Sequence, residues 1–324
     1  MNRRLLLGLI FLISININAA QQIPNVVVSI KPIHSIVSTL MNGVSKPLLL
    51  LKSNESAHTF HIKPSQLNLL SNADLLITIG DNFESGLSKV LRNIDENVRL
   101  NLSEIKELQI YDFRDHNEIG HDEHDEHNEH DEHDEHDGHN EHDEHDEHDE
   151  HDEHYKDLHL WLDIDNVQII ANKISQRLIE IDPSNKEKYN TNYLELESKL
   201  SQLKEKIQFQ LKPIKLIPFA VFSDTLQYFE KSFDLKNPVV ITPYHGARLS
   251  INRVIKSKNK IKNLEIRCLI YGPENTPKQI NVLAEGLDIK AHSIDILGVK
   301  LDSGSEQYFD LMKEISNQLV ACLE

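Results

Sequence analysis

Short apolar runs rich in β-branched residues alternate with helical patterns along most of the chain, and this alternation limits the fold more than any other feature. The runs that predict strands are 26–31, 47–52, 74–80, 98–101, 216–222, 238–242, 264–271 and 288–294. Strands that alternate with helices form parallel sheets covered by helices on both faces. Because the runs fall into two blocks, the sequence predicts an α/β protein of two lobes, each built on a parallel sheet.

A long charged stretch, 184–212, separates the two blocks and carries apolar residues at near-helical spacing. Pro183 suits an early helical position and Pro213 ends the pattern, so we expect one helix of about eight turns. Since a helix is stiffer than a loop, the lobes should face each other across a cleft that opens only modestly. The predicted divisions are an N-terminal lobe 21–182, a linker helix 183–212 and a C-terminal lobe 213–324.

The N-terminus predicts export from the cytoplasm. Arg3 and Arg4 precede an apolar run, 5–15, and small or polar residues lead to Ala19 and Ala20. This order is typical of a signal peptide, here 1–20, and no later segment is long enough to span a membrane. No cysteine lies near the predicted cleavage site, which argues against lipid attachment. We therefore expect a periplasmic protein without a membrane anchor, and a monomer.

The chain has two cysteines, Cys268 and Cys322. An oxidising compartment favours a disulfide between them, with two buried free thiols as the alternative. A thiolate zinc site is disfavoured because the cysteines lack close CxxC spacing.

The segment 112–157 differs in kind from the rest of the chain. It holds 23 acidic and two basic residues, a net charge of −21, whereas the remainder of the chain carries +3. Histidines stand at 121 and at every third residue to 154, usually with Asp-Glu between them. With so few apolar residues the segment is predicted to be a disordered insertion. The near-neutral remainder gives no reason to expect nucleic acid or an anionic membrane as a partner.

Twelve of these histidines beside carboxylates predict contact with a transition metal, most of all zinc. A flexible array must be ordered when metal binds, so each ion should bind less tightly than in a preformed site. The alternative is a repeat expanded by replication slippage with incidental affinity.

Polar residues that follow the predicted strands are candidates for a defined metal site, because sites in open α/β sheets lie beyond the carboxyl ends of strands. His58 follows the second strand, Ser223 and Asp224 follow the strand ending at Phe222, and Asp295 follows the last strand. His159 stands just after the histidine repeat. These loop ends should face one cleft between the lobes.

Several of these segments resemble the substrate-binding proteins of bacterial zinc and manganese ABC transporters, and within them the periplasmic zinc-uptake proteins. The matching segments are Ser-Ile-Lys-Pro (29–32), Ala-His-Thr-Phe (57–60) with Lys-Pro-Ser (63–65), Asn-Ala-Asp-Leu (72–75), His-Leu-Trp-Leu-Asp (159–163), Phe-Ser-Asp (222–224) with Tyr-Phe (228–229), and Gly-Ala-Arg-Leu (246–249). A histidine-rich acidic loop just before His-Leu-Trp-Leu is also typical of the zinc members. The resemblance implies two lobes joined by a rigid helix, metal held between them, delivery to a membrane permease, and a Cys268–Cys322 disulfide.

The resemblance also implies site residues. His58 and His159 match two zinc-ligand histidines of the family, and Asp295 matches a carboxylate ligand of several members. Ser223 departs from the pattern, because zinc members have a third histidine there and manganese members a glutamate. The predicted zinc shell is therefore His58, His159, Asp295 and one open position.

The candidates for that open position are water, a repeat histidine, His61, His34, His292 and Ser223 itself. A competing role for Asp295 is to cap the turn at Gly298. His245 is expected to have no chemical role, and Trp161 to be an anchor in the core or cleft wall.

These sequence features are compatible with three functions. The leading one is a periplasmic protein that binds Zn²⁺ as cargo and delivers it to an ABC importer, with a manganese-binding member of the same family as a variant. The second is a zinc buffer or chaperone that acts mainly through the histidine-rich loop. The third is a zinc hydrolase. We expect no enzyme, since the chain has no HExxH helix and only Asp224 stands near the site as a general base.

Overall fold

The computed structural model describes residues 23–51, 60, 62–114, 156–242 and 250–324. The predicted signal peptide, the histidine repeat, His58, His61 and His245 lie outside the described residues.

The first parallel sheet has the strand order β2-β1-β3-β4 and forms the core of the N-terminal lobe. Its strands are β1 Val26–Val28, β2 Leu48–Leu49, β3 Leu75–Thr78 and β4 Arg99–Asn101, and its helices are α1 Lys31–Leu40, α2 Pro64–Ser71 and α3 Ser88–Leu91. β1 and β3 consist only of apolar residues and Thr78, and all their side chains are buried. Burial on both faces is what a parallel sheet covered by helices requires.

The second parallel sheet has the order β10-β9-β7-β8. Its strands are β7 Ala220–Ser223, β8 Val239–Thr242, β9 Cys268–Tyr271 and β10 Lys290–Ser293, and the helices between them are α6 Gln227–Ser232, α7 Ile251–Asn263 and α8 Pro277–Ala284. All eight predicted strands are therefore present, and the predicted α/β fold with two parallel sheets is confirmed.

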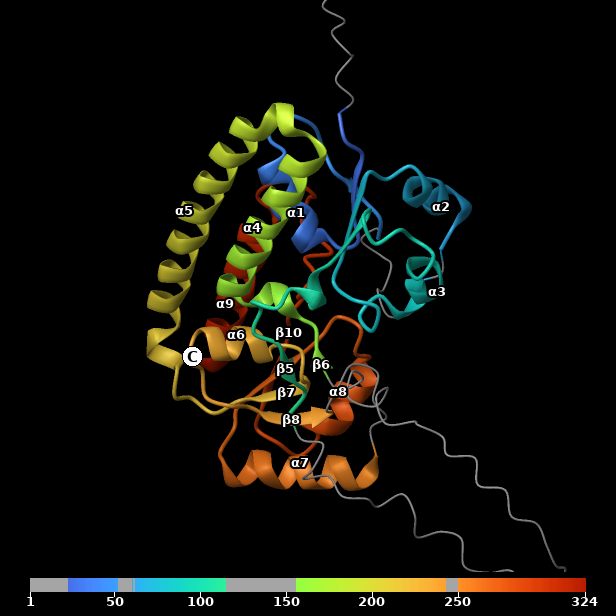
Figure 1. Cartoon of the computed structure of the whole chain (residues 1–324). Coiled ribbons are helices and arrows are strands. Elements are labelled where there is room, and N and C mark those ends of the chain that lie inside the picture. The colour runs from blue at the N-terminus through green and yellow to red at the C-terminus, as the bar shows by residue number, and fades with distance from the viewer. Residues whose placement is uncertain (1–22, 52–59, 61, 115–155, 243–249) are drawn as a thin grey trace, which may run out of the picture.

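Two long helices, α4 Ile164–Ile181 and α5 Lys186–Leu211, lie side by side along one flank of the molecule (Figure 1). α5 is the long helix predicted between the two blocks, and the 3₁₀ turn Pro183–Asn185 leads into it. The other 3₁₀ turns among the described residues are Ser85–Leu87, Leu102–Glu104, Leu160–Leu162 and Lys212–Ile214. Among the described helices, none is both long and apolar enough to cross a membrane.

The last helix, α9 Gln307–Leu323, packs against α1 and α5 as well as against β9 and β10. Its buried Tyr308 donates a backbone N–H to Ser35 Oγ at 3.0 Å and its hydroxyl to the carbonyl of Trp161 at 2.9 Å. α9 thus follows the second sheet in sequence but contacts the first lobe as closely. The predicted domain limits remain a prediction.

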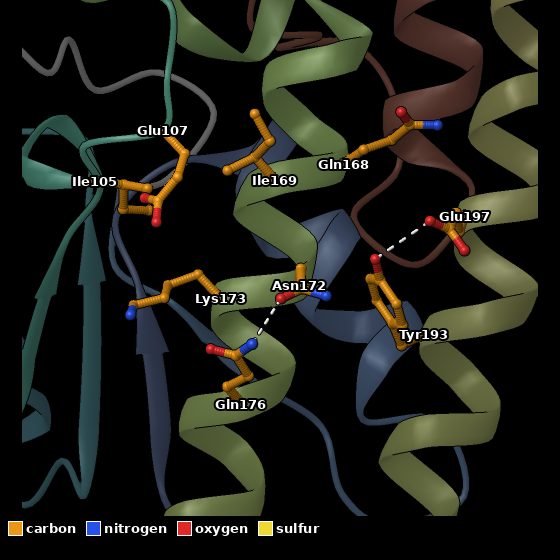
Figure 2. A pocket seen from close by; sticks show the side chains of 9 residues that line it. All are labelled: Ile105, Glu107, Gln168, Ile169, Asn172, Lys173, Gln176, Tyr193 and Glu197. Atoms are coloured by element: carbon orange, nitrogen blue, oxygen red, sulfur yellow. Dashed lines mark hydrogen bonds between the residues drawn. The ribbon is translucent and has the colours of Figure 1, made fainter.

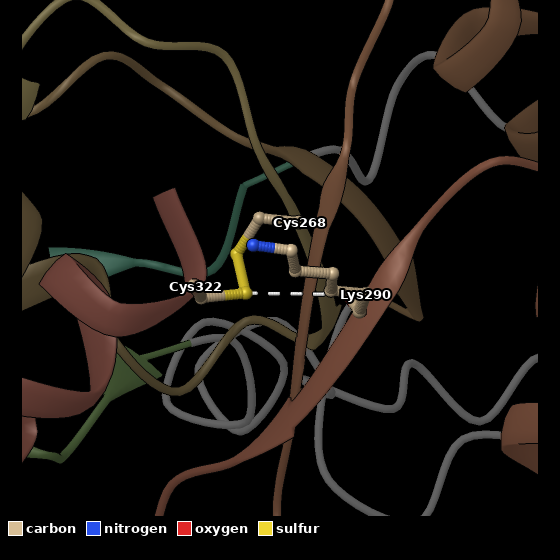
Figure 3. Close-up of a disulfide and its surroundings, with 3 residues drawn as sticks. All are labelled: Cys268, Lys290 and Cys322. Carbon is tan, nitrogen blue, oxygen red and sulfur yellow. Dashed lines mark hydrogen bonds between the residues drawn. A yellow bond between two sulfur atoms is a disulfide. The ribbon is translucent and has the colours of Figure 1, made fainter. Parts of the chain in front are cut away.

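A disulfide between Cys268 and Cys322 joins β9 to α9 (Figure 3). The two Cα atoms lie 5.4 Å apart, and Cys322 Sγ is 3.9 Å from the carbonyl oxygen of Lys290 on β10. The predicted pairing is confirmed, and it ties the last helix to the second sheet.

A short antiparallel ladder connects the two sides of the histidine repeat. It consists of β5 Tyr111–Asp112 and β6 Lys156–Asp157, and Lys156 Nζ lies 2.8 Å from Asp112 Oδ1. The ring of Tyr111 packs at a tilt against that of Tyr228 of α6, with centroids 4.9 Å apart, and the backbone N–H of Tyr111 donates to the Tyr228 hydroxyl at 3.2 Å. The base of the repeat is therefore attached to the second lobe.

Candidate metal centre

The best-defined candidate ligand is His159, which follows β6 and precedes the Leu160–Leu162 turn. Its side chain is buried, and its Nδ1 atom lies 2.6 Å from Oδ1 of Asp157. A carboxylate only accepts hydrogen bonds, so the neutral imidazole carries its proton on Nδ1. The Nε2 atom then keeps the lone pair that a metal ion needs.

Asp157 is itself fixed from several directions. Its Oδ1 also accepts the backbone N–H of His159 at 3.0 Å, and its Oδ2 accepts from Gln227 Nε2 at 3.3 Å. The Tyr228 hydroxyl donates to the Asp157 carbonyl at 2.7 Å. Since Gln227 and Tyr228 both belong to α6, the second lobe sets the orientation of the His159 ring.

Aromatic rings surround the His159 imidazole. The Phe83 and Trp161 ring centroids lie 5.8 and 5.3 Å from it, both in edge-on arrangements. Trp161 is fully buried and donates its indole N–H to the carbonyl of Ile296 at 2.8 Å. This bond joins the loop after His159 to the loop that contains Asp295, and it agrees with the predicted role of Trp161 as a core anchor.

Asp295 caps a turn. Its Oδ1 accepts the backbone N–H groups of Leu297 and Gly298, both at 3.0 Å, and its Oδ2 accepts that of Val299 at 2.6 Å. Gly298 has a φ of +64°, which favours glycine. Asp295 therefore has the turn-capping role that its sequence position suggested, and its role as a metal ligand stays a prediction.

The turn after Asp295 is held against the first lobe by Lys31. Its Nζ donates to the carbonyl groups of Gly298, Val299 and Leu301 at 3.2, 2.9 and 2.8 Å. Burial lowers the pKa of Lys31, while the nearby carboxylates of Asp295 and Asp302 oppose that shift. The predicted carboxylate ligand thus sits on a turn that both lobes fix.

Ser223 is the last residue of β7, and its side chain is buried. Its Oγ lies 3.0 Å from Thr242 Oγ1, and Thr242 donates its own proton to the carbonyl of Phe222 at 2.7 Å. The Ser223 hydroxyl is then the donor to Thr242. A neutral hydroxyl that donates to a neighbour is a weak zinc ligand.

Asp224, the next residue, is committed to an ion pair. It is fully buried and accepts from Arg114 through the backbone N at 2.9 Å and through Nε at 3.0 Å, and Arg114 Nη2 also contacts it closely. Nη1 of the same guanidinium lies 2.7 Å from Glu230 Oε2. Because Asp224 is neutralised in this way, it is a poor general base, which removes the one candidate base for the hydrolase alternative.

The structure describes two further histidines, His34 and His292. His34 on α1 is buried, and its Nε2 lies 3.1 Å from the carbonyl oxygen of Pro47. Burial lowers the pKa of His34, because it disfavours the imidazolium, so this ring is a neutral structural group. His292 stands half-buried in the edge strand β10.

Within the described part of the chain, no group of three or more His, Cys, Asp or Glu side chains could hold a metal ion. An open pocket formed by α4, α5 and the loop with Ile105 is lined by three amides, two carboxylates, one lysine, one tyrosine and two isoleucines, without histidine or cysteine (Figure 2). In it Gln176 donates to Asn172 at 2.8 Å and Tyr193 to Glu197 at 3.3 Å. That pocket is therefore no metal centre.

Asp157 and Arg114 were not identified from the sequence as the partners of His159 and Asp224. Asp157 stands two positions before His159, a spacing that lets one carboxylate oxygen reach both the backbone and the ring of the histidine. That spacing was the available signal. Arg114 gave none, because its partner Asp224 lies 110 residues further along the chain.

Solved structures share this fold. The chain superposes on a crystal structure of ZnuA with a TM-score of 0.73 at 18% identity, covering 94% of this chain and 100% of that one. A zinc-bound ZnuA deletion mutant gives 0.72 at 18% identity, covering 94% and 99% of the two chains. These two likenesses show the fold, which consists of two parallel α/β lobes with a long helix beside them.

Sequence comparison gives the family itself. Residues 26–322 match the family described as zinc-uptake complex component A, periplasmic. The high-affinity zinc uptake system protein ZnuA of Brucella abortus is 38% identical over 304 residues, covering 92% of this chain and 91% of that protein, and the Yersinia pestis protein of the same name is 28% identical over 306 residues with the same coverages. The chain belongs to the ZnuA family, whose members are periplasmic metal-binding receptors of ABC transporters and not enzymes. The resemblance read from the sequence is confirmed.

Proposed function

We propose that this protein captures Zn²⁺ in the cleft between its lobes and delivers it to the permease of an ABC importer. His159 Nε2 is one ligand, and His58 and Asp295 are the others. The observation that carries the proposal is the buried His159 ring whose Nδ1 faces Asp157 at 2.6 Å. A carboxylate that orients the second nitrogen is the usual outer partner of a metal-binding histidine.

Contacts near the other two proposed ligands support a common site. Gly86 lies so close to Phe60 that a Cβ on Gly86 would stand 2.2 Å from the Phe60 carbonyl oxygen. Phe60 comes two residues after His58, and Phe83, in the same loop as Gly86, packs on His159. On the other side Trp161 bonds to Ile296, the neighbour of Asp295. Phe60 and Ile296, each close in sequence to a proposed ligand, therefore lie near the loop of His159.

Ligand chemistry and the relatives named above both favour zinc as the cargo. Two imidazoles and one carboxylate make a known kind of zinc shell, whereas manganese favours a shell richer in oxygen. The fourth position belongs to water, His61, Ser223 or a repeat histidine. The protein acts in the periplasm as a monomer after removal of residues 1–20. Its N-terminal lobe is 21–182, its linker helix 183–212 and its C-terminal lobe 213–324.

Competition titration of zinc against a chelator tests the site directly. We expect the mature chain and a variant lacking 115–155 to bind one zinc ion with the same high affinity. His159→Ala should lose that tight binding, and His245→Ala, at a histidine expected to have no chemical role, serves as the matched control that keeps it. Affinity should fall at acidic pH, since imidazole must be neutral to bind metal and its reference pKa is about 6.5. Tight binding that disappears with 115–155 and persists in His159→Ala would reject the proposal.

A zinc buffer that works through the histidine repeat is the second candidate, and Ser223 is the observation that favours it. A hydroxyl that donates to Thr242 stands where zinc members have a histidine. In that case deletion of 115–155 abolishes zinc uptake by cells and His58→Ala leaves uptake unchanged. The reverse pattern supports the cleft.

A further inference from the structure

Helix α7 carries an unneutralised basic surface. Its 13 residues include Arg253, Lys256, Lys258, Lys260 and Lys262 and no acidic residue. Lys256 and Lys262 are exposed, Arg253 and Lys258 are half-buried, and the structure gives the side chains of these four no ion pair with any residue it describes. Like charges four residues apart, as at Lys258 and Lys262, repel each other on a helix. We call these four side chains the α7 basic face.

The side of α7 that lies between Arg253 and Lys258 is used for packing, and Lys256 and Lys262 lie away from it. Ser257 and Ile261 are buried, and Ile261 belongs to the apolar cluster between α7 and the second sheet. The basic face is therefore free to contact a partner without loss of any core contact.

The strongest anion available to this face is part of the same chain. Residues 115–155 contain 21 acidic residues and no lysine or arginine. Opposite charges of this density attract over about one Debye length, roughly 8–10 Å at physiological ionic strength. The α7 basic face is thus purely positive, whereas the segment has carboxylates and no lysine or arginine, so the two are complementary in charge.

The acidic segment also begins near the end of the strand that precedes α7. Arg114, the residue before it, bonds to Asp224, which directly follows the end of β7. Ser223 at the end of β7 pairs with Thr242 at the end of β8, and α7, the next described helix in sequence, packs against β8. Since parallel strands end at one edge of a sheet, the acidic segment begins at the edge where β8 ends.

The length of the segment allows full contact. Half of its 41 residues spans up to about 65 Å when extended, whereas a helix of 13 residues is about 20 Å long. A tethered partner also has an effective concentration in the millimolar range or above, which favours it over partners free in solution.

We propose that the acidic segment 115–155 binds the α7 basic face within the same molecule. The main alternative occupant is an anionic lipid surface, which the exposed Ile251 and Ile255 beside the lysines would suit. The tether and the 21 carboxylates favour the segment.

Carbodiimide cross-linking of the full mature chain tests this, because the reagent joins a lysine amine to a carboxylate in contact with it. We expect cross-links from Lys256, Lys258 and Lys262 to carboxylates of 115–155 at low salt. Their yield should drop several-fold at about 0.5 M salt, where screening is strong.

Lys262 then serves as a reporter in a neutralised variant. In Arg253→Gln/Lys256→Gln/Lys258→Gln the Lys262 cross-link to 115–155 should fall at least about threefold. The matched control Lys89→Gln/Lys106→Gln/Lys206→Gln removes the same charge from exposed lysines elsewhere and should leave the yield unchanged.

Three results would overturn the proposal. The first is a yield of cross-links from Lys89, Lys106 and Lys206 equal to that from α7. The second is an unchanged Lys262 yield in the neutralised variant. The third is binding of the full chain to phosphatidylglycerol vesicles that the α7 variant loses, without cross-links from Lys262 to 115–155, which assigns the face to lipid.

Discussion

Oδ1 of Asp157 accepts hydrogen bonds from both the Nδ1 atom and the backbone nitrogen of His159, at 2.6 and 3.0 Å. One carboxylate oxygen thereby fixes the tautomer of the ring and the conformation of the loop that carries it. The ring is buried and packs against Phe83 and Trp161, so its Nε2 atom is held in rigid, apolar surroundings. Such preorganisation lowers the entropy that a metal site loses on binding.

Asp157→Ala should therefore weaken zinc binding by about 10- to 100-fold, because the ring loses its orienting partner. Asp157→Asn should recover most of the affinity, since its side-chain oxygen still accepts the Nδ1 proton. Competition titration with a chelator measures both, and thermal unfolding of the metal-free variants controls for lost stability. Equal affinity in all three proteins would contradict the orienting role.

Asp295→Asn separates the two roles of that carboxylate. Asparagine keeps one accepting oxygen but loses the bond to the Val299 N–H, so the metal-free chain should lose about 1 kcal/mol of unfolding free energy. If Asp295 is a ligand as proposed, zinc affinity should fall at least tenfold as well. A loss of stability with unchanged affinity would leave Asp295 with the turn alone.

Ser223→His should raise zinc affinity at least tenfold, because it supplies an imidazole at the open position of the proposed shell. The substitution removes the hydrogen bond to Thr242, at a cost of about 1 kcal/mol in stability. Thr225→His adds a histidine two residues further on and should leave affinity unchanged. If both variants bind zinc like the parent chain, the fourth ligand does not come from β7.

Glu230 should make the protein less stable as pH rises. Burial raises its pKa to about 7, and the Arg114 guanidinium opposes that shift. Between about pH 4.5 and pH 7 the folded chain keeps a proton on Glu230 that the unfolded chain has lost, so its contribution is complete below pH 4.5 and is lost as pH passes 7.

Urea unfolding of the parent chain and Glu230→Gln at pH 5 and pH 8 checks this. Glu230 should account for a loss of roughly 3 kcal/mol at most across that range, and the glutamine variant should lack this part. Identical pH dependence of the two proteins would show that Arg114 keeps Glu230 ionised throughout.

The candidate site was only partly accessible from the sequence. His159 was predicted from its motif, and the structure gives it a buried, oriented ring. Asp295 was predicted with two roles, of which the structure describes the turn. The partners of Asp224 could not be predicted, because charge and spacing do not tell which of 34 basic residues reaches a given carboxylate.

The sequence by itself determined the alternation of strands and helices, the long helix and the likeness to metal receptors, because these depend on local periodicity and short motifs. Only the tertiary structure decided that Arg114 neutralises Asp224, 110 residues away, and that Trp161 bonds to Ile296, 135 residues away. The physical reason is that the spacing of apolar residues along a helix or strand specifies which of its faces is buried, whereas the packing of whole lobes specifies which loop ends meet.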